Sequence, residues 1–197
     1  EAKGTRPGST IVAWDGLAVI VNNKNTVKQL TMDQLRDIFM GTIKNWSEVG
    51  GPNLPIEIVN RDTSSGTHEY FLEHVLRKGN SKGKENFPNT ALAVTSSQAA
   101  AQTVAQDEGA IAYVGLGYVT PKVSSLAIAK DKSSPYVKPD IATVLDRSYP
   151  ISRPLYFYTN SNPTGEVKKY VDFVLSDKGR QIVEKQGFVP IAEQGAK

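Results

Sequence analysis

The sequence predicts an α/β fold because two kinds of apolar pattern alternate along the chain. Leu17–Val21 is an unbroken apolar run, which is typical of a strand that is buried on both faces. Residues 31–39 instead carry apolar side chains at helical spacing. Segments of these two kinds alternate as far as Gly187. Strands that alternate with helices indicate a mixed α/β architecture.

A strand is expected close to the start of the chain. Residues 1–9 are polar and contain both glycine and proline, so we expect an extended or frayed start. Residues 11–22 then read as a strand, which the dipeptide Asp15-Gly16 should interrupt.

The first helix has clear start and stop signals. Thr31 and Gln34 have the spacing of a capping box, in which each side chain bonds a free backbone N–H group at the helix start. Gly41 should end this helix. Trp46 follows in a turn, where we expect it to anchor the packing. The buried stripe of the helix should consist of Leu35, Ile38 and Phe39.

The remaining elements are read from the same signals. The expected strands cover residues 56–60, 110–114, 126–129 and 155–159. The expected helices are one that ends before Gly79, one capped by Ser97, one that begins at Asn162-Pro163 and one that restarts at Ser176-Asp177. Residues 130–150 are rich in proline and show no strong period.

Composition excludes several classes of function. The 197 residues contain no cysteine, so disulfides, thiolate catalysis and cysteine-bound metals are excluded. His68 and His74 are the only histidines, and their spacing does not match a helical zinc pair, so we predict no metal and no cofactor. The net charge of +3 is too small and too dispersed to predict nucleic-acid binding. No apolar run approaches the ~20 residues that a membrane helix needs.

The most informative segment is the turn that follows the strand at residues 56–60. Arg61, Ser65, Gly66 and Thr67 lie between this strand and the next helix. The first N–H groups of a helix have no internal acceptor, so they favour a bound anion. The two hydroxyl groups add donors, the glycine lets a ligand approach the backbone, and the guanidinium matches a tetrahedral oxyanion. The turn therefore predicts an anion site.

Two other interpretations of this turn remain open. Ser-Ser-Gly-Thr is also a common helix cap, because serine and threonine bond the free N–H groups of a first turn. Alternatively, Ser65 could be a nucleophile with His68 or His74 as its base. The chain lacks the Gly-x-Ser-x-Gly elbow, and a serine and a histidine three residues apart on one helix rarely reach attack geometry. We therefore predict no enzymatic activity.

Several segments, in order, resemble the phosphate-binding solute receptors of phosphate ABC transporters. The resemblance covers nearly the whole chain, and its order and spacing make it specific. The segments are Trp14–Asn22, Leu30–Gly41, Asn45-Trp46, Val49–Gly51, Asn60–Asp62, Ser65–Thr67, Gly109–Gly115, Tyr149–Tyr156 and Gly187–Ile191.

The resemblance implies a two-lobed periplasmic-binding-protein-like fold with two crossover strands and phosphate in the cleft between the lobes. Residues 20–152 would form one complete α/β lobe. Residues 1–19 and 153–197 would supply the crossover strands, near Leu17–Val21 and Pro154–Tyr158, and a partial second lobe. Arg61, Ser65, Gly66 and Thr67 match the family's phosphate-binding turn.

One departure from the family pattern affects the expected partners. In the family, about a third of the mature chain precedes the Trp-Asp-Gly strand, and it carries a Ser/Thr-rich loop and a proton-accepting carboxylate. Here only about a dozen residues precede Trp14, so we expect the chain to be a C-terminal fragment or one piece of a split receptor. A companion polypeptide would then have to supply the missing segment. The other expected partners are inorganic phosphate and a membrane ABC permease, and the expected location is periplasmic or extracellular, with a lipid anchor as one option for the full-length form. A receptor for sulfate or another tetrahedral oxyanion, and a cell-surface signalling or adhesion relative, are the alternatives.

Overall fold

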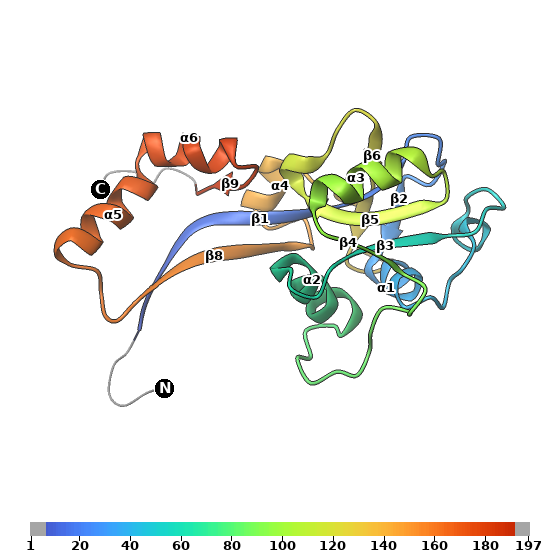
Figure 1. Ribbon diagram of the computed structural model, residues 1–197, viewed down its shortest axis with the longest axis horizontal. Coiled ribbons are helices and arrows are strands. Elements are labelled where there is room, and N and C mark those ends of the chain that lie inside the picture. Colours follow the sequence, from blue (N-terminus) through green and yellow to red (C-terminus); the bar gives the residue numbers. More distant parts are fainter. Residues whose placement is uncertain (1–6, 192–197) are drawn as a thin grey trace.

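The computed structural model describes residues 7–191, so the expectation of an extended or frayed start over residues 1–9 lies, for residues 1–6, outside the described part of the chain. Its strands are β1 (Gly8–Asn22), β2 (Gln29–Thr31), β3 (Glu57–Arg61), β4 (Leu92–Val94), β5 (Ala110–Gly115), β6 (Val123–Ser125), β7 (Ala127–Ala129), β8 (Ser152–Thr159) and β9 (Val189–Pro190). Its helices are α1 (Met32–Phe39), η1 (Trp46–Val49), α2 (Gly66–Phe71), η2 (Leu72–Leu76), α3 (Ser97–Gln106), η3 (Leu116–Tyr118), α4 (Ile141–Leu145), α5 (Gly165–Leu175) and α6 (Asp177–Lys185). The sheet and its helices confirm the α/β prediction (Figure 1).

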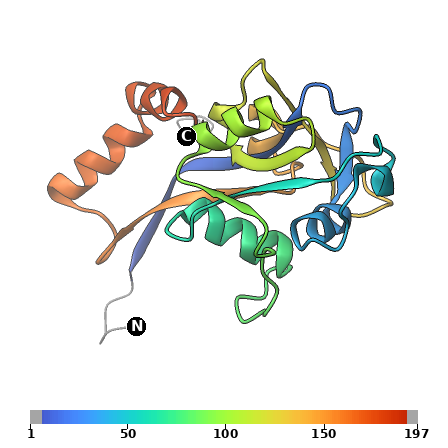
Figure 2. The same ribbon diagram turned by 45° about the vertical axis from the view of Figure 1, so that its right-hand side comes forward.

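Strand β1 joins two parts of the molecule. Its second half lies in the sheet β4-β3-β5-β1-β6, where Leu17–Val21 pairs antiparallel with β5. Its first half pairs with β8 and, at residues 13 and 14, with β9. We call residues 17–151 the body and residues 8–16 with 152–191 the arm, which extends away from the body in Figures 1 and 2.

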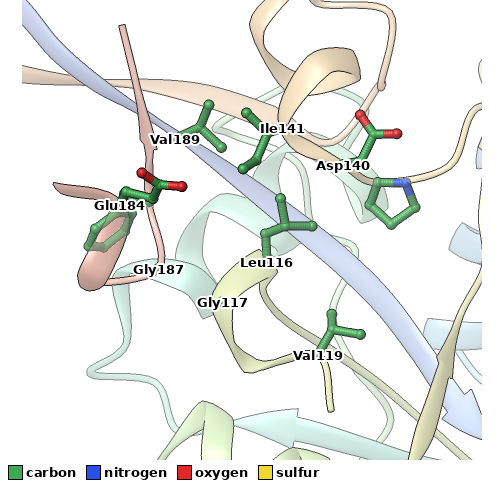
Figure 3. Close-up of a pocket in the computed structure, with 10 residues that line it drawn as sticks. Leu116, Gly117, Val119, Asp140, Ile141, Glu184, Gly187 and Val189 are labelled. Atoms are coloured by element: carbon green, nitrogen blue, oxygen red, sulfur yellow. The ribbon is translucent and has the colours of Figure 1, made fainter. Parts of the chain in front are cut away.

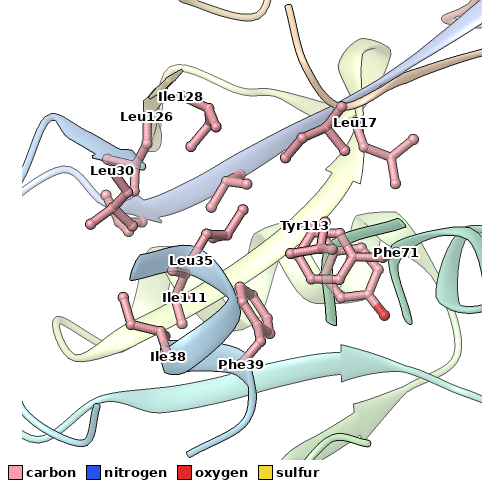
Figure 4. Packing of buried hydrophobic residues seen from close by; sticks show 14 of the residues in the cluster. Leu17, Leu30, Leu35, Ile38, Phe39, Phe71, Ile111, Tyr113, Leu126 and Ile128 are labelled. Atoms are coloured by element: carbon pink, nitrogen blue, oxygen red, sulfur yellow. The ribbon is translucent and has the colours of Figure 1, made fainter. Parts of the chain in front are cut away.

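The body has a core on each face of its sheet. Leu17, Val19 and Val21 pack on one face, together with α1 and the aromatic side chains of α2 and β5 (Figure 4). Ala18 and Ile20 point to the opposite face and pack under α3. Because successive side chains of a strand alternate between faces, this arrangement confirms that Leu17–Val21 is buried on both sides.

The first helix follows its sequence signals. Thr31 accepts a hydrogen bond from the backbone N–H of Gln34, and the Gln34 side chain accepts one from Thr31 in return. Trp46 is fully buried and donates from Nε1 to the carbonyl of Gly109 at 2.9 Å, so it anchors the packing as predicted. The stripe of α1 is also fully buried and consists of Leu35, Ile38 and Phe39.

Several boundaries differ from the predictions. Asp15-Gly16 does not interrupt β1, because this dipeptide pairs with Arg153 and Ser152 of β8, and the register shift lies between Ile11 and Ala13 instead. The segment of β1 that pairs with β8 is therefore residues 8–16, just before Leu17–Val21.

The starts of two helices also differ from the predictions. Ser96, not Ser97, caps α3, since its hydroxyl accepts from the N–H of Ala99 at 3.0 Å. Thr164 is the N-cap residue of α5, which begins two residues after Pro163. The proline-rich segment contains α4, whose capping box joins Asp140 and Thr143.

The arm buries few of its apolar side chains. Helices α5 and α6 both form, and α6 begins at the predicted position with Ser176 as its cap. Of the apolar side chains of α5, only Val171 is buried.

None of the helices in residues 7–191 has both the length and the apolar character that a membrane crossing requires.

Candidate functional site

The predicted turn lies where two parallel strands end side by side. Strand β3 pairs in parallel with β4, and Arg61 lies opposite Val94 at their carboxyl ends. The chain leaves β3 through residues 62–65 and enters α2, and it leaves β4 through residues 95–96 and enters α3. Two helix starts therefore share one edge of the sheet, which is where ligands commonly bind in open α/β sheets.

Backbone hydrogen bonds fix the path of the turn. The N–H of Asp62 donates to the carbonyl of Val94 at 3.1 Å, and the N–H of Ser65 donates to the carbonyl of Asp62 at 3.1 Å. The Asp62 carboxylate accepts from both the backbone N–H and the hydroxyl of Ser64. These bonds, and chiefly the one from the Ser64 hydroxyl, hold the pKa of Asp62 below its ordinary value.

The first turn of α2 presents free donors. The buried Ser65 hydroxyl accepts from the N–H of His68 at 3.4 Å, so Ser65 does cap the helix. Gly66 and Thr67 are the next two residues, and N–H groups at these positions have no acceptor within the helix. The space beside the Cα of Gly66 is open, so a ligand can approach this backbone. Ser65, Gly66 and Thr67 are thus brought together as donors at one helix start.

Arg61 lies behind this turn, bonded to the start of α3. Its Nη1 donates to the Ser97 hydroxyl at 3.0 Å and its Nη2 to the Thr95 carbonyl at 3.3 Å. Its Nε is buried and has no hydrogen-bond partner among the described residues. The Asp62 carboxylate lies 3.9 Å from Nη2. The guanidinium therefore places a mostly buried positive charge at the sheet edge.

Asn60 is a positioning residue that sequence reasoning did not identify. Its buried Oδ1 accepts from the N–H of Arg61 at 2.8 Å, lies 3.1 Å from Nδ1 of His68 and accepts from the Tyr113 hydroxyl. Tyr113 in turn stacks on Phe71, with 3.9 Å between the ring centroids. One amide thereby links β3, β5 and α2. An asparagine near the end of a strand, directly after its apolar residues, was the available sequence signal.

Neither histidine is placed to activate Ser65. Burial lowers the pKa of His68, whose ring is directed to Asn60 rather than to the serine hydroxyl. His74 points its Nε2 at the carbonyl of Pro150, 2.8 Å away. Within residues 7–191, no three histidine, aspartate or glutamate side chains gather as metal ligands would. The arrangement suits anion binding better than nucleophilic chemistry.

A separate cavity of about 350 Å³ lies between η3, α4 and the turn before β9 (Figure 3). Gly117 and Gly187 come so close here that a Cβ on Gly117 would lie 2.4 Å from the Cα of Gly187. Asp140 and Glu184 are the charged residues of the lining, and no lysine or arginine joins them. Two carboxylates without a cation repel an anion, so this cavity is no alternative to the turn.

Comparisons with known proteins place this geometry in a family. Residues 2–178 match the sequence model of the PBP superfamily domain. The phosphate-binding protein PstS of Pseudomonas aeruginosa is 33% identical over an aligned length of 205 residues. This alignment covers 95% of this chain and 61% of the relative. PstS of Bacillus subtilis is 36% identical over 184 residues, which cover 92% of this chain and 57% of that protein. The chain thus spans about three fifths of the length of these relatives.

A solved structure shows the same fold. The crystal structure of a putative phosphate ABC transporter substrate-binding protein from Clostridium perfringens, with bound phosphate, superimposes with a TM-score of 0.77. It is 33% identical, and the alignment covers 94% of this chain and 72% of that one. By sequence and by fold, this chain belongs to the PBP superfamily and is similar to its phosphate-binding receptors.

Proposed function

We propose that this chain is part of a solute receptor that binds inorganic phosphate and delivers it to a membrane ABC permease. The observation that carries the proposal is the turn from Arg61 to Thr67, where free N–H groups meet a buried guanidinium at the carboxyl edge of parallel strands. The similar protein from Clostridium perfringens, by its description, holds bound phosphate.

Each residue of the turn has a distinct part in this proposal. The N–H groups of Gly66 and Thr67 donate to the anion at the positive end of the helix. The Thr67 hydroxyl adds a donor, and the Ser65 hydroxyl donates its own proton while it continues to accept from His68. Arg61 supplies a full positive charge from a poorly solvated position, where its field is only weakly screened.

We further propose that residues 20–152 act as one lobe, and that residues 1–19 and 153–197 belong to crossover strands and to a partial second lobe. The support is the arm, where many of the large apolar side chains are exposed. A companion segment, in the same precursor or in another polypeptide, would pack on them and bring a Ser/Thr-rich loop and a carboxylate. The exposed side chains that it would cover include Tyr156, Tyr158, Val167, Tyr170, Phe173 and Ile182.

The same turn also suits sulfate, which is the first alternative. Helix N–H groups and an arginine do not distinguish the two anions, because both are tetrahedral and negatively charged. Only an acceptor placed to receive the proton of phosphate rejects sulfate, and that acceptor would come from the companion segment. The second alternative is a cell-surface relative with a role in signalling or adhesion.

A receptor of this kind needs no chemistry, so we propose that the protein is not an enzyme. The engagement of the Ser65 hydroxyl as a helix cap supports this. The proposed location is periplasmic or extracellular, since the receptor must meet its ligand before the permease does. We add to this location the proposal of a lipid anchor on the full-length form, which mass spectrometry of the membrane fraction tests.

The proposal is tested on the protein as it is purified from its host, with any polypeptide that accompanies it. Calorimetry should show saturable binding of inorganic phosphate that excess sulfate does not displace. Equal competition by sulfate would replace phosphate by the first alternative, and binding of neither anion would leave the second. Native mass spectrometry of the same sample should show the companion segment.

A further inference from the structure

Arg153, at the start of β8, makes contacts with three separate parts of the molecule. Its Nε and Nη2 donate to Oδ2 of Asp15 on β1 at 3.1 Å and 3.0 Å. Its Nη1 donates to the carbonyl of Gly66 in the anion turn at 3.0 Å. Its guanidinium also lies over the ring of Tyr70, 4.9 Å from the ring centroid. One side chain of the arm therefore reaches the backbone of the anion turn.

Asp15 anchors this arginine. The residue is only 4% exposed, and its two hydrogen bonds to the guanidinium fix the plane of the arginine fork. Burial raises the pKa of Asp15, and the positive charge of Arg153 opposes that rise. The carboxylate of this pair is buried and the guanidinium is partly exposed, and Nη1 of the arginine is left to donate to Gly66.

Further contacts hold the same face of the helix to the same segment. The Tyr70 hydroxyl donates to the carbonyl of Ser152 at 2.8 Å, and His74 contacts the carbonyl of Pro150. Gly66, Tyr70 and His74 follow one another at intervals of four, so they share one face of the helix. The segment from Pro150 to Arg153 thus supports the helix of the anion turn along its length.

The bond to Gly66 acts on the anion through a single peptide unit. The carbonyl of Gly66 and the N–H of Thr67 belong to the same planar peptide group, and they point in opposite directions. An arginine that holds the carbonyl therefore fixes the direction of the Thr67 N–H, which is one of the proposed anion donors. A charged donor on the carbonyl also polarises the amide, which makes its N–H a stronger donor.

We propose that Arg153 is a positioning residue of the phosphate site, which orients the Thr67 N–H from the crossover strand with Asp15 as its anchor. The inference rests on the proposed function of the turn. It makes the alignment of one anion donor depend on the junction between β1 and β8, although Arg153 itself does not touch the anion.

The substitution Arg153→Lys tests this proposal. Lysine keeps the charge beside Asp15, but its compact ammonium group cannot reproduce the planar fork that bonds Asp15 and Gly66 together. We expect phosphate to bind about two- to tenfold more weakly, the factor that corresponds to one lost hydrogen bond, without a comparable change in the unfolding midpoint. The amide proton of Thr67 in the ligand-free protein should shift in the NMR spectrum.

Arg36→Lys is the matched control. Arg36 also donates from Nε to a backbone carbonyl, that of Leu76 at the opposite end of the same helical segment, and it also pairs with carboxylates. Its side chain is 23% exposed, against 27% for Arg153. This control should leave both the phosphate affinity and the Thr67 amide unchanged.

The outcomes separate this inference from the proposed function. If the unmodified protein binds no phosphate, the proposed function fails, and the Thr67 amide still decides whether Arg153 positions the turn. Wild-type affinity together with an unchanged Thr67 amide in Arg153→Lys would overturn the inference. Should that variant not fold, Asp15→Asn, which keeps an acceptor for the arginine, must show a smaller loss of the same kind, and an unaltered affinity and amide there would overturn it too.

Discussion

Helices α1 and α5 carry the same kind of amphipathic pattern but lie in different surroundings. In α1, Leu35, Ile38 and Phe39 are fully buried against the sheet of the body. In α5, Val167, Tyr170 and Phe173 keep 52%, 61% and 43% of their surface exposed. A repeat of apolar side chains thus predicts the helix in both places, but it predicts burial only where a broad sheet surface is available.

The sheet explains this difference. Helix α1 packs near β1 and β5, where paired strands offer a continuous apolar face. Helix α5 instead packs against α6 and, through the stacked rings of Phe157 and Tyr170, against the narrow pairing of β1 and β8. The body is therefore expected to hold most of the stability and the anion site, while the arm depends on a further surface.

The largest expected effect comes from two phenylalanine substitutions, one in each helix. Phe39→Ala removes a ring that packs against Phe71 and Tyr113, and it should lower the free energy of unfolding by about 3–5 kcal/mol. Phe173→Ala in α5 should lower it by less than about 1 kcal/mol, because much of that ring is already in solvent. Denaturant unfolding measures both, and equal losses would remove the distinction between body and arm.

The second comparison concerns phosphate affinity. Arg61→Ala removes the buried charge behind the anion turn, and we expect the binding free energy to weaken by about 2–5 kcal/mol. Lys169→Ala is the control in the arm, where the exposed ammonium group pairs with Glu166, and it should leave the affinity unchanged. Calorimetry with phosphate gives both values, and an unchanged affinity in Arg61→Ala would exclude Arg61 from the site.

Two helix caps allow a finer comparison. Ser65 caps α2 and Ser176 caps α6 in the same way, each accepting from the N–H three residues later. Replacement of either by alanine should cost about 1 kcal/mol of stability. Ser65→Ala and Thr67→Ala should also weaken phosphate binding, each by about 1.5–3 kcal/mol, whereas Ser176→Ala should not. Normal binding in both variants would reduce Ser65 and Thr67 to structural residues.

The smallest expected effect is a pH dependence that belongs to the body, where both histidines lie. Burial lowers the pKa of His68 in the folded protein below 6.5, so the unfolded chain takes up a proton there more readily than the native one. The stability is therefore complete above pH 6.5 and declines as the pH falls from 6.5 through the lower folded-state pKa. In His68→Gln this part of the decline should disappear from unfolding curves measured at a series of pH values; a persistent decline would assign it to other groups.

Local patterns in the sequence were sufficient for much of the fold. The apolar run Leu17–Val21 predicted a strand buried on both faces, and the capping box at Thr31 and Gln34 predicted the start of α1. The turn from Arg61 to Thr67 was recognisable as well, since a strand, a polar turn and a helix start are neighbours along the chain. Each of these features depends on residues that are a few positions apart.

The features that the sequence did not predict depend on partners far along the chain. Asp15-Gly16 continues β1 because β8 pairs with it, and α4 shows no period because Val144 is its only buried residue. Asn60, Ser97 and Arg153 have roles around the anion turn only through the groups that they contact. The Arg61–Ser97 bond joins residues 36 positions apart, Arg153 and Gly66 are 87 apart, and Arg153 and Asp15 are 138 apart. Only tertiary packing brings such groups within hydrogen-bond distance, because the chain between them carries no local signal of where its ends will meet.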